Sequence, residues 1–474
     1  MMGQIRPLLV INNHNSLTLI KICSDIGAQG HALAPVAVAS DRHFDECRQA
    51  LAGWGTAVCW NGVSIPQGTA TAAARTSSPT RRRLRGTLEF LADNLSPGQY
   101  ARELNIRWKL KRLQKRAAAI FDEHKPNVVL SMSDRNHDYL ESCLLLEARR
   151  RGIRIILPYV AHYDIEGAMG YRLDTNGRVL AEYAPWTRPT LYKLWAARRL
   201  RHTMQSDVFF QHSFLLNAHD KNGSMSAFPW WTGNGLSDVV CVNSRHSFDV
   251  YRENRVAEAK LSIVGDIFYD TLFAACERRA DLRRELTQKY KLTPDRKLIV
   301  LAMPQYAEQG YLDAKRHWEE IERLLSILSR RGADLLISLH PRMDPREYSY
   351  LSDKFSSRIA GERLASVLPA ADLFVSYYSS TVVWATLCGI PAIVADALGN
   401  RLSLFDYLTS VQVVEPRHLS EAVDAALTGV IDFTQDWREL SHGDVFDGRT
   451  AHRYWTLLES AAASRICGEM PHNH

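Results

Sequence analysis

Short apolar runs rich in β-branched residues alternate with longer amphipathic stretches along most of the chain. This alternation is typical of parallel sheets covered by helices, because consecutive parallel strands need a long crossover connection. At 474 residues the chain is too long for one hydrophobic core, so domains of about 200 residues each are expected. We therefore predict an α/β protein with two doubly wound, Rossmann-like domains. The runs are PLLVI (7–11), HALAPVAVA (31–39), NVVLSMS (127–133), RIILPYVA (154–161), DVVCVNS (238–244), LSIVG (261–265), KLIVLAM (297–303), DLLISL (334–339), DLFVS (372–376) and PAIVAD (391–396).

A change of composition divides the two predicted domains. Residues 224–238 combine Pro, Gly, Asn and two adjacent Trp residues, which is typical of a crossover between domains. We predict a first domain over residues 1–226, with a basic helical insertion at about 78–115. The second domain is expected over 235–457, followed by a tail at 458–474.

Cysteine usage and hydropathy indicate the compartment. The eight cysteines are scattered, without a C-x-x-C pair or a spacing that suits zinc, which fits reduced thiols. The N-terminal stretch lacks the features of a signal peptide, and no window approaches the roughly 20 apolar residues that cross a bilayer. We expect a cytoplasmic protein.

The net charge of +6 is concentrated in the first half of the chain, in the runs 81–86, 107–116 and 195–202. Such runs commonly form solvated helix faces. Alternatively, because aromatic residues interleave with them, they form a surface for the anionic lipid of the inner membrane or for an acidic polymer. Nucleic acid is not an expected partner, since no sequence motif of a nucleic-acid-binding fold is present.

The stretch LISLHPRMD ends an apolar strand abruptly with His340, Pro341 and Arg342. In parallel α/β sheets, ligands bind at the carboxyl ends of strands. The planar guanidinium of Arg342 suits phosphate oxygens, and His340 can donate another hydrogen bond. The pair therefore predicts a phosphate site, although a capping His and a surface Arg would produce the same pattern.

A second polar cluster follows the strand that ends at Ser376. Ser379, Ser380 and Thr381 are expected at the start of a helix that runs to Leu387. Free backbone N–H groups and hydroxyls at a helix start attract anions. The alternative is simple capping of the helix, but this cluster and the His-Pro-Arg motif are predicted at adjacent strand ends, which favours a shared phosphate site.

The order of these motifs resembles the donor-binding domain of GT-B glycosyltransferases. The stretches SDVVCVNSRHSFDVYRENRVAEAKLSIVGDIFYDTL, LIVLAMPQYAEQG, LISLHPR and LASVLPAADLFVSYYSSTVVWATLCGIPAIV are similar to the bacterial surface-polysaccharide branch with a His-Pro and a Ser-Ser motif. That branch includes sialyl- and Kdo-transferases and CDP-glycerol glycerophosphotransferases. The UDP-N-acetylglucosamine 2-epimerases share the fold. The resemblance covers about residues 235–415 and the first domain only in outline.

The resemblance implies a role for each motif. His340 and Arg342 would bind the donor phosphates, and Ser379 and Ser380, next to Thr381, would bind phosphate or ribose. Two neighbouring loops of the donor site would contain Gly265 with Asp266, and Pro304 with Gln305.

One position departs from the related enzymes. Many of them have a ribose-binding Glu just before the Ala of the last donor helix, whereas this chain has Val383 and Trp384 before Ala385. The departure favours donors of the CMP or CDP type over UDP-sugars.

The first domain is expected to supply the acceptor site and a general base for an inverting transfer. His162 resembles the His that follows the corresponding strand in the related transferases and is our first candidate for the base. Asp134, at the end of the preceding strand, ranks second, and Asp164, two residues after His162, is a further catalytic candidate. His14 is a candidate for acceptor binding. Solvation of the loop His, and capping roles for Asp134 and for the residues around His14, are the alternatives.

No metal or other cofactor is implied, because no D-x-D motif follows a strand and side chains can neutralise a leaving phosphate. We predict a glycosyltransferase that moves a sugar from a nucleotide-sugar donor to a bacterial surface glycan or its lipid-linked precursor. Alternatives are a UDP-N-acetylhexosamine 2-epimerase or hydrolase, and a non-catalytic scaffold in polysaccharide assembly.

Overall fold

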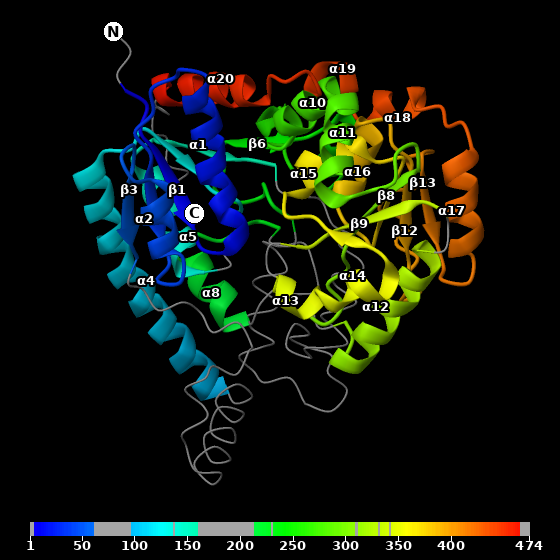
Figure 1. Cartoon of the computed structure of the whole chain (residues 1–474). Coiled ribbons are helices and arrows are strands. Elements are labelled where there is room, and N and C mark those ends of the chain that lie inside the picture. The colour runs from blue at the N-terminus through cyan, green and yellow to red at the C-terminus, as the bar shows by residue number, and fades with distance from the viewer. Residues whose placement is uncertain are drawn as a thin grey trace.

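The computed structural model of the chain contains two parallel β-sheets, each covered by helices on both faces (Figure 1). The structure describes residues 4–60, 96–135, 138–159, 213–228, 231–308, 311–329, 332–340 and 343–464. The predicted α/β class with two Rossmann-like domains is confirmed.

The first sheet has seven strands in the order β3-β2-β1-β4-β5-β6-β7. Its strands are β1 (Pro7–Ile11), β2 (Val36–Ala39), β3 (Thr56–Cys59), β4 (Val128–Leu130), β5 (Arg154–Leu157), β6 (Val239–Val242) and β7 (Leu261–Ile263). Each predicted run in this half of the chain forms a strand. The edge strand β3 was missed because TAVC is short and only partly buried.

The second sheet has six strands in the order β10-β9-β8-β11-β12-β13. Its strands are β8 (Leu298–Ala302), β9 (Asp334–Ser338), β10 (Arg358–Ile359), β11 (Leu373–Ser376), β12 (Ala392–Ala395) and β13 (Val411–Val414). The four predicted strands form its centre, whereas the two edge strands, β10 and β13, were not predicted. Two residues are too few to show a periodicity in β10, and β13 is partly exposed.

Alternating residues of the central strands fill separate cores on the two faces of each sheet. In β1, Leu8 and Val10 pack against α4, α5 and α8, whereas Leu9 and Ile11 face α1 and α20. Burial of both faces explains why these strands are continuous apolar runs.

Helices connect the strands and provide the remaining walls of the cores. In the first domain they are α1 (Thr18–Ala28), α2 (Phe44–Ala50), α4 (Ser96–His124), α5 (Tyr139–Arg150), α8 (Ser213–Asn222) and α9 (Arg245–Glu253), with 3-10 turns at His14–Leu17 and Glu258–Lys260. The rest are α10 (Tyr269–Glu277), α11 (Arg279–Tyr290), α12 (Ala314–Leu328), α13 (Pro345–Tyr348), α14 (Tyr350–Phe355), α15 (Leu364–Val367), a 3-10 turn at Leu368–Ala370, α16 (Thr381–Leu387), α17 (Leu419–Thr428), α18 (Thr434–Glu439), α19 (His442–Val445) and α20 (Thr450–Ala463).

The predicted boundary between the domains, near residues 226–235, is wrong. Strands β6 and β7 lie after it but belong to the first sheet, because β6 pairs with β5 and β7 pairs with β6. The chain leaves this sheet only after Ile263 and enters the second domain through α10. The Gly- and Trp-containing stretch around 224–238 is therefore a connection within the first domain.

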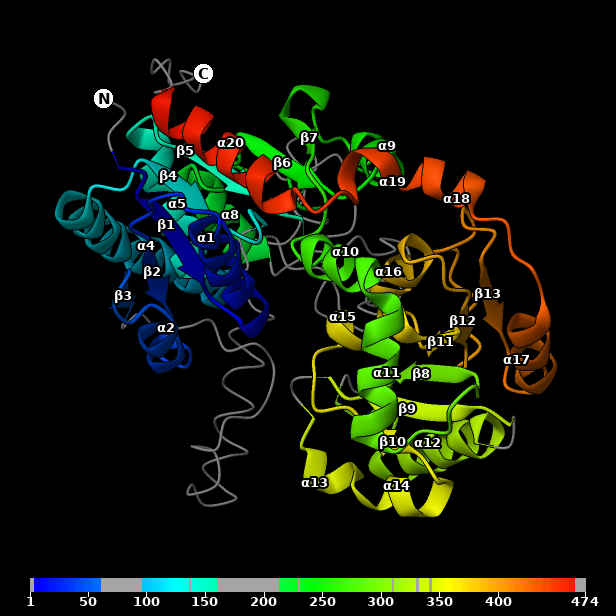
Figure 2. The same cartoon turned by 45° about the horizontal axis from the view of Figure 1, so that its top comes forward.

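The predicted end of the second domain is wrong as well. Helix α20 returns to the first domain, where it packs against α1 and buries Tyr454 and Leu458 in the core beneath it (Figures 1 and 2). His31 stacks on Trp455 with ring centroids 4.2 Å apart. The chain thus crosses between the domains twice, before α10 and before α20.

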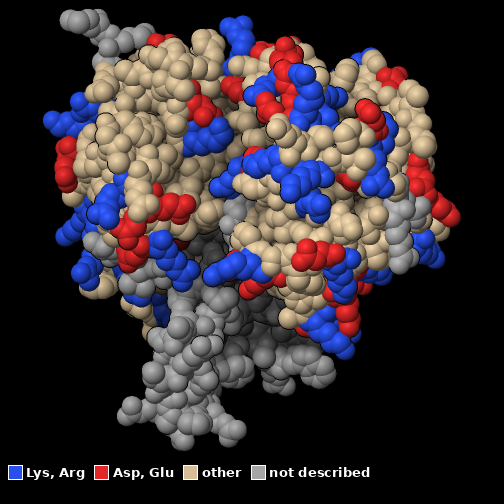
Figure 3. Space-filling model, viewed as in Figure 1, with Lys and Arg blue, Asp and Glu red and all other residues tan. Residues whose placement is uncertain are grey.

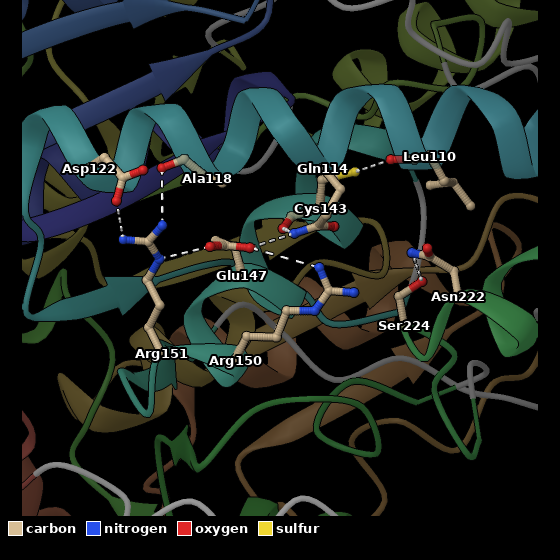
Figure 4. Close-up of polar contacts among 10 residues, drawn as sticks. All are labelled: Leu110, Gln114, Ala118, Asp122, Cys143, Glu147, Arg150, Arg151, Asn222 and Ser224. Carbon is tan, nitrogen blue, oxygen red and sulfur yellow. Dashed lines mark hydrogen bonds and ion pairs between the residues drawn. The ribbon is translucent and has the colours of Figure 1, made fainter.

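Helix α4 is part of the first domain's helical layer rather than an insertion at 78–115, and residues 61–95 lie outside the described part. Figure 4 shows its contacts with α5. The Gln114 amide donates to Glu147 Oε2 at 2.9 Å. The Arg151 guanidinium donates to Glu147 Oε1 and to Asp122 Oδ1, both at 2.7 Å. Buried Leu110 and Phe121 complete the contact with the core.

Candidate functional site

The strand order identifies the edge position at which sheets of this type bind ligands. In doubly wound sheets, the crevice lies between the two central strands whose connections run in opposite directions. In the second sheet these strands are β8, which leads through α12 to β9, and β11, which leads through α16 to β12. In the first sheet they are β1 and β4.

The loops after β8 and β11 are in direct contact. The rings of Tyr306 and Tyr377 meet edge to face with centroids 5.0 Å apart. Gln305 precedes Tyr306 and is half-buried, and Ser379 follows Tyr377 by two residues. The topology therefore places two of the predicted donor-binding segments side by side at the carboxyl edge of the sheet.

A third loop, after β12, is tied to the same place. Asp396 is buried and accepts hydrogen bonds from the Tyr378 hydroxyl at 3.2 Å and from the backbone N–H of Arg401 at 2.8 Å. The Asn400 amide donates to the Tyr377 hydroxyl at 2.6 Å. This network was missed from the sequence, although the Tyr-Tyr pair immediately before the Ser residues was visible there. It holds the loop that carries Ser379 in a defined position.

The two Ser residues have different environments. The Ser379 hydroxyl accepts the backbone N–H of Thr381 at 3.3 Å and lies 2.8 Å from the Thr381 hydroxyl. Ser379 thus performs part of the capping role that was the alternative to ligand binding. Ser380 occupies the N-cap position of α16, makes no side-chain capping bond and is exposed. Of the two hydroxyls, that of Ser380 is the one presented at the surface.

His340 follows β9 at the same edge and is half-buried. Its carbonyl oxygen accepts the N–H of Met343 at 2.9 Å, which closes a turn. The prediction that the His-Pro-Arg and Ser-Ser motifs follow adjacent strands is wrong, because β8 lies between β9 and β11. Neighbouring strands lie about 4.8 Å apart. His340 follows β9, which is two strands away from β11 and the Ser cluster, and Gln305 follows β8 between them. Pro341 and Arg342 lie outside the described residues.

Gly265 and Asp266 lie where the chain leaves the first sheet. Gly265 has a φ of +99°, and a Cβ atom there would lie 3.1 Å from Thr450 Oγ1 and 3.2 Å from the Tyr269 ring. The positive φ and the close contacts explain why residue 265 is a glycine, without reference to any ligand. Asp266 is buried and accepts the N–H of Phe268 at 2.9 Å.

Trp384 lies in α16, directly before Ala385. Its indole N–H donates to Asp266 Oδ2 at 3.3 Å, and its ring lies 5.1 Å from that of Phe268. Burial raises the pKa of Asp266 to about 6, although the Phe268 and Trp384 hydrogen bonds and the charge of Lys21 oppose the increase. Trp384 is thus engaged in a contact with the segment that links the domains.

The first sheet gathers polar groups at the corresponding edge. His14 begins the 3-10 turn after β1 and is half-buried, and the Asn13 side chain caps this turn by accepting the N–H of Ser16. The Asn12 amide donates to Glu141 Oε2 at 3.3 Å. Asn12 therefore bridges from the loop after β1 to the helix after β4.

Asp138 is a carboxylate at this edge that was not among the predicted site residues. It caps α5 by accepting the N–H of Glu141 at 2.8 Å, and burial raises its pKa. The D-x-x-E spacing of Asp138 and Glu141, typical of a helix start, was the available signal. The N–H of Leu140 and the Asn12 side chain also contribute hydrogen bonds to Asp138, and its place at this edge of the sheet adds it to the candidates on the acceptor side.

Asp134 has a structural role in this structure. Its carboxylate accepts the N–H groups of Gly233 and Gly235, both at 2.8 Å, and the N–H and hydroxyl of Ser237 at 3.3 and 2.7 Å. Oδ1 accepts one of these four bonds and Oδ2 accepts the other three, and the side chain is buried. These bonds give Asp134 a structural role, and its role as a base stays a prediction.

His162, the first candidate for the base, and Asp164 lie outside the described residues. Within the described ranges, no group of three or more His, Cys, Asp or Glu side chains is arranged to hold a metal ion. None of the helices in those ranges combines the length and hydropathy needed to cross a membrane.

Comparison with known proteins identifies the fold. No family model matches the sequence, and no curated protein is similar to it in sequence. Among solved structures, the calicheamicin glycosyltransferase CalG4 superposes with a TM-score of 0.54 at 12% identity, over 99% of this chain and all of that one. The chain has the GT-B fold.

Other GT-B structures match less closely. UDP-GlcNAc 2-epimerase from Neisseria meningitidis has a TM-score of 0.49 at 12% identity, over 96% of this chain and 100% of its own. The wall teichoic acid polymerase TagF has a TM-score of 0.46 at 11% identity, over 97% and 88%.

Proposed function

We propose that the protein is a glycosyltransferase that uses a nucleotide-activated sugar. The observation that carries the proposal is the contact between the loops after β8 and β11, where Tyr306 meets Tyr377. This contact lies at the edge where doubly wound sheets bind nucleotides. Gln305 lies next to Tyr306 on one side of the contact, and the Ser cluster follows Tyr377 on the other.

On the donor side, the phosphates would rest on His340, Arg342 and Ser380, with Gln305 between the strand ends. Positively charged and hydroxyl donors aimed at a leaving phosphate stabilise the charge that develops in the transition state. Ser379 would act mainly by holding the turn in which Ser380 is presented, and Thr381 supports that turn.

The environment of Trp384 supports a donor of the CMP or CDP type. Its indole is committed to Asp266 and Phe268, and its neighbour Val383 is buried. Neither side chain can accept hydrogen bonds from ribose hydroxyls as a Glu at this helix position would. A UDP-sugar bound here would therefore lack the ribose-binding carboxylate that a Glu provides.

On the acceptor side, His162 or Asp164 would remove the proton of the attacking hydroxyl, and Asp138 is a further candidate. His14 would contact the acceptor at the end of β1. Closure of the two domains would exclude water before transfer. The acceptor would be a bacterial surface glycan or its lipid-linked precursor.

A stripe on α4 supports attachment to the cytoplasmic face of the inner membrane. Tyr100, Leu104 and Trp108 are 49%, 43% and 61% exposed and follow one another at intervals of four residues, so they lie on one face of the helix. Lys111 and Lys115 continue that exposed face. Aromatic and aliphatic side chains next to basic ones suit an anionic lipid surface.

The charges elsewhere are distributed differently. Figure 3 shows basic and acidic side chains interspersed over both domains on the face that it presents. On that face, the net positive charge of the chain is not collected into one large patch.

Two measurements test the function. Calorimetric titration with CMP, CDP and UDP should detect binding, with CMP or CDP preferred; no binding of any nucleotide at millimolar concentration would favour the scaffold. Incubation with candidate nucleotide sugars in the absence of acceptor should leave them intact. Rapid epimerisation or hydrolysis of UDP-N-acetylhexosamine would instead establish the epimerase or hydrolase.

A further inference from the structure

Two cysteines that are distant in the sequence meet in the second domain. Cys276 lies in α10 and Cys388 follows the last residue of α16. The two thiols lie close enough to interact with one another, and both pack in the same hydrophobic cluster. Both are free thiols, and Cys276 is partly exposed whereas Cys388 is buried.

Arg279 supplies a positive charge at this pair. Its guanidinium donates to the carbonyl oxygen of Cys388, and its charge acts on the Cys276 thiol, which lies three residues before it. The neighbouring Cys388 thiol and the charge of Arg279 lower the pKa of Cys276 to about 7, against the effect of burial. Burial raises the pKa of Cys388. Near neutral pH, Cys276 is thus partly a thiolate and Cys388 a thiol.

A partly exposed thiolate next to a second thiol is the arrangement of reversibly oxidised cysteines. We propose that Cys276 and Cys388 form a disulfide when the protein is exposed to a hydroperoxide. The inference stands on the contact between the thiols and on Arg279, and it does not depend on the function proposed above.

The reaction proceeds in two balanced steps. The Cys276 thiolate attacks the peroxide, so that an S–O bond forms and the O–O bond breaks; the sulfur is oxidised to a sulfenic acid and the peroxide, after taking up a proton, is reduced to water or an alcohol. The Cys388 sulfur then attacks that of Cys276. An S–S bond forms, the S–O bond breaks, and the hydroxyl leaves with the thiol proton as water. An external dithiol reverses the change by exchange.

The disulfide would fix the helix that carries the Ser cluster. Helix α16 begins after Ser380 and contacts the segment before α10 through Trp384 and Asp266. A bond between Cys388 and α10 adds a covalent tie at the other end of α16.

The test uses the full-length protein with stoichiometric hydrogen peroxide at neutral pH, alkylation of the remaining thiols and peptide mass spectrometry. We expect a linked peptide pair that joins Cys276 to Cys388, is lighter by two hydrogen atoms and is lost after treatment with dithiothreitol. Cys276→Ser should abolish the link. Cys388→Ser should leave a sulfenic acid on Cys276 that a 1,3-diketone traps.

Two controls separate this chemistry from general oxidation. Cys59→Ser removes another partly exposed thiol and should leave the link unchanged. Arg279→Gln should slow alkylation of Cys276 by iodoacetamide near pH 7, by up to about tenfold for each unit by which its pKa rises. The proposal is overturned if neither peroxide nor diamide links the two residues in the folded protein, or if Cys276 is alkylated no faster than Cys59.

Discussion

The Trp384 indole donates a hydrogen bond to the buried carboxylate of Asp266 at 3.3 Å. Trp384 lies in α16 of the second domain, and Asp266 lies in the segment through which the chain leaves the first sheet. Nearby, His246 of α9 stacks on Tyr407 with centroids 3.4 Å apart. The helix that carries the candidate donor site is therefore fixed to the connection between the domains.

Substitution Asp266→Asn should make the protein more stable relative to wild type at high pH. Burial raises the pKa of Asp266 from 3.8 to about 6, so the native state holds a proton that the unfolded chain releases. The stability that this carboxyl contributes is complete below about pH 4 and is lost as the pH rises through about 6. The difference between the two pKa values corresponds to on the order of 3 kcal/mol.

Unfolding midpoints of wild type and Asp266→Asn, measured from about pH 4 to 8, check this prediction. The advantage of the variant should grow between about pH 4 and 6 and then level off. A difference between the two proteins that stays constant with pH would contradict it.

Substitution His340→Ala should reduce transfer by about 100-fold or more, because a donor to the leaving phosphate is lost, and should leave the unfolding midpoint nearly unchanged. His418→Ala is the matched control, since His418 lies in the same domain, is exposed and makes no side-chain capping bond. A large loss of stability in His340→Ala would instead indicate a capping role.

The two Ser residues should respond differently to substitution by Ala. Ser379→Ala should lower stability by about 1 kcal/mol, because the N–H of Thr381 loses its acceptor. Ser380→Ala should leave stability unchanged and weaken nucleotide binding. Thermal unfolding and calorimetric titration separate the effects, and equal losses of binding with no change in stability would contradict the assignment.

Substitution Asp134→Asn should destabilise the protein by roughly 2–4 kcal/mol, because the amide nitrogen would face the N–H donors of residues 233–237. Activity per folded molecule should persist. Denaturant unfolding measures the loss, with exposed Asp353→Asn as a control that should change stability by less than about 0.5 kcal/mol. Loss of activity at unchanged stability would instead support Asp134 as a base.

Replacement of Tyr100, Leu104 and Trp108 by Ser should reduce cosedimentation with phosphatidylglycerol vesicles, because the apolar part of the exposed stripe is removed. Trp437→Ser is the control, since Trp437 is exposed in the second domain. Binding by wild type should fall as salt is added. Equal binding by the triple variant and the control would exclude this stripe as the membrane contact.

The sequence by itself determined the fold class and the ends of the central strands. Residues such as Leu8, Val10, Leu298 and Val375 form continuous apolar runs because both faces of a parallel sheet are buried. Each run stops where the chain reaches the polar carboxyl edge of the sheet. The segments around His340, Gln305 and the Ser cluster were therefore recognisable as loops at a ligand-binding edge.

Only the tertiary structure decided which strands are neighbours and which side chains meet. A strand pattern records burial but not the identity of the partners, so β6 and β7 looked like the start of the second domain, and β8 was not expected between β9 and β11. Gly235, Asp266 and Cys388, which contact Asp134, Trp384 and Cys276 respectively, are all distant from them in the sequence. Such contacts arise from long-range packing of the folded chain, which local periodicity does not encode.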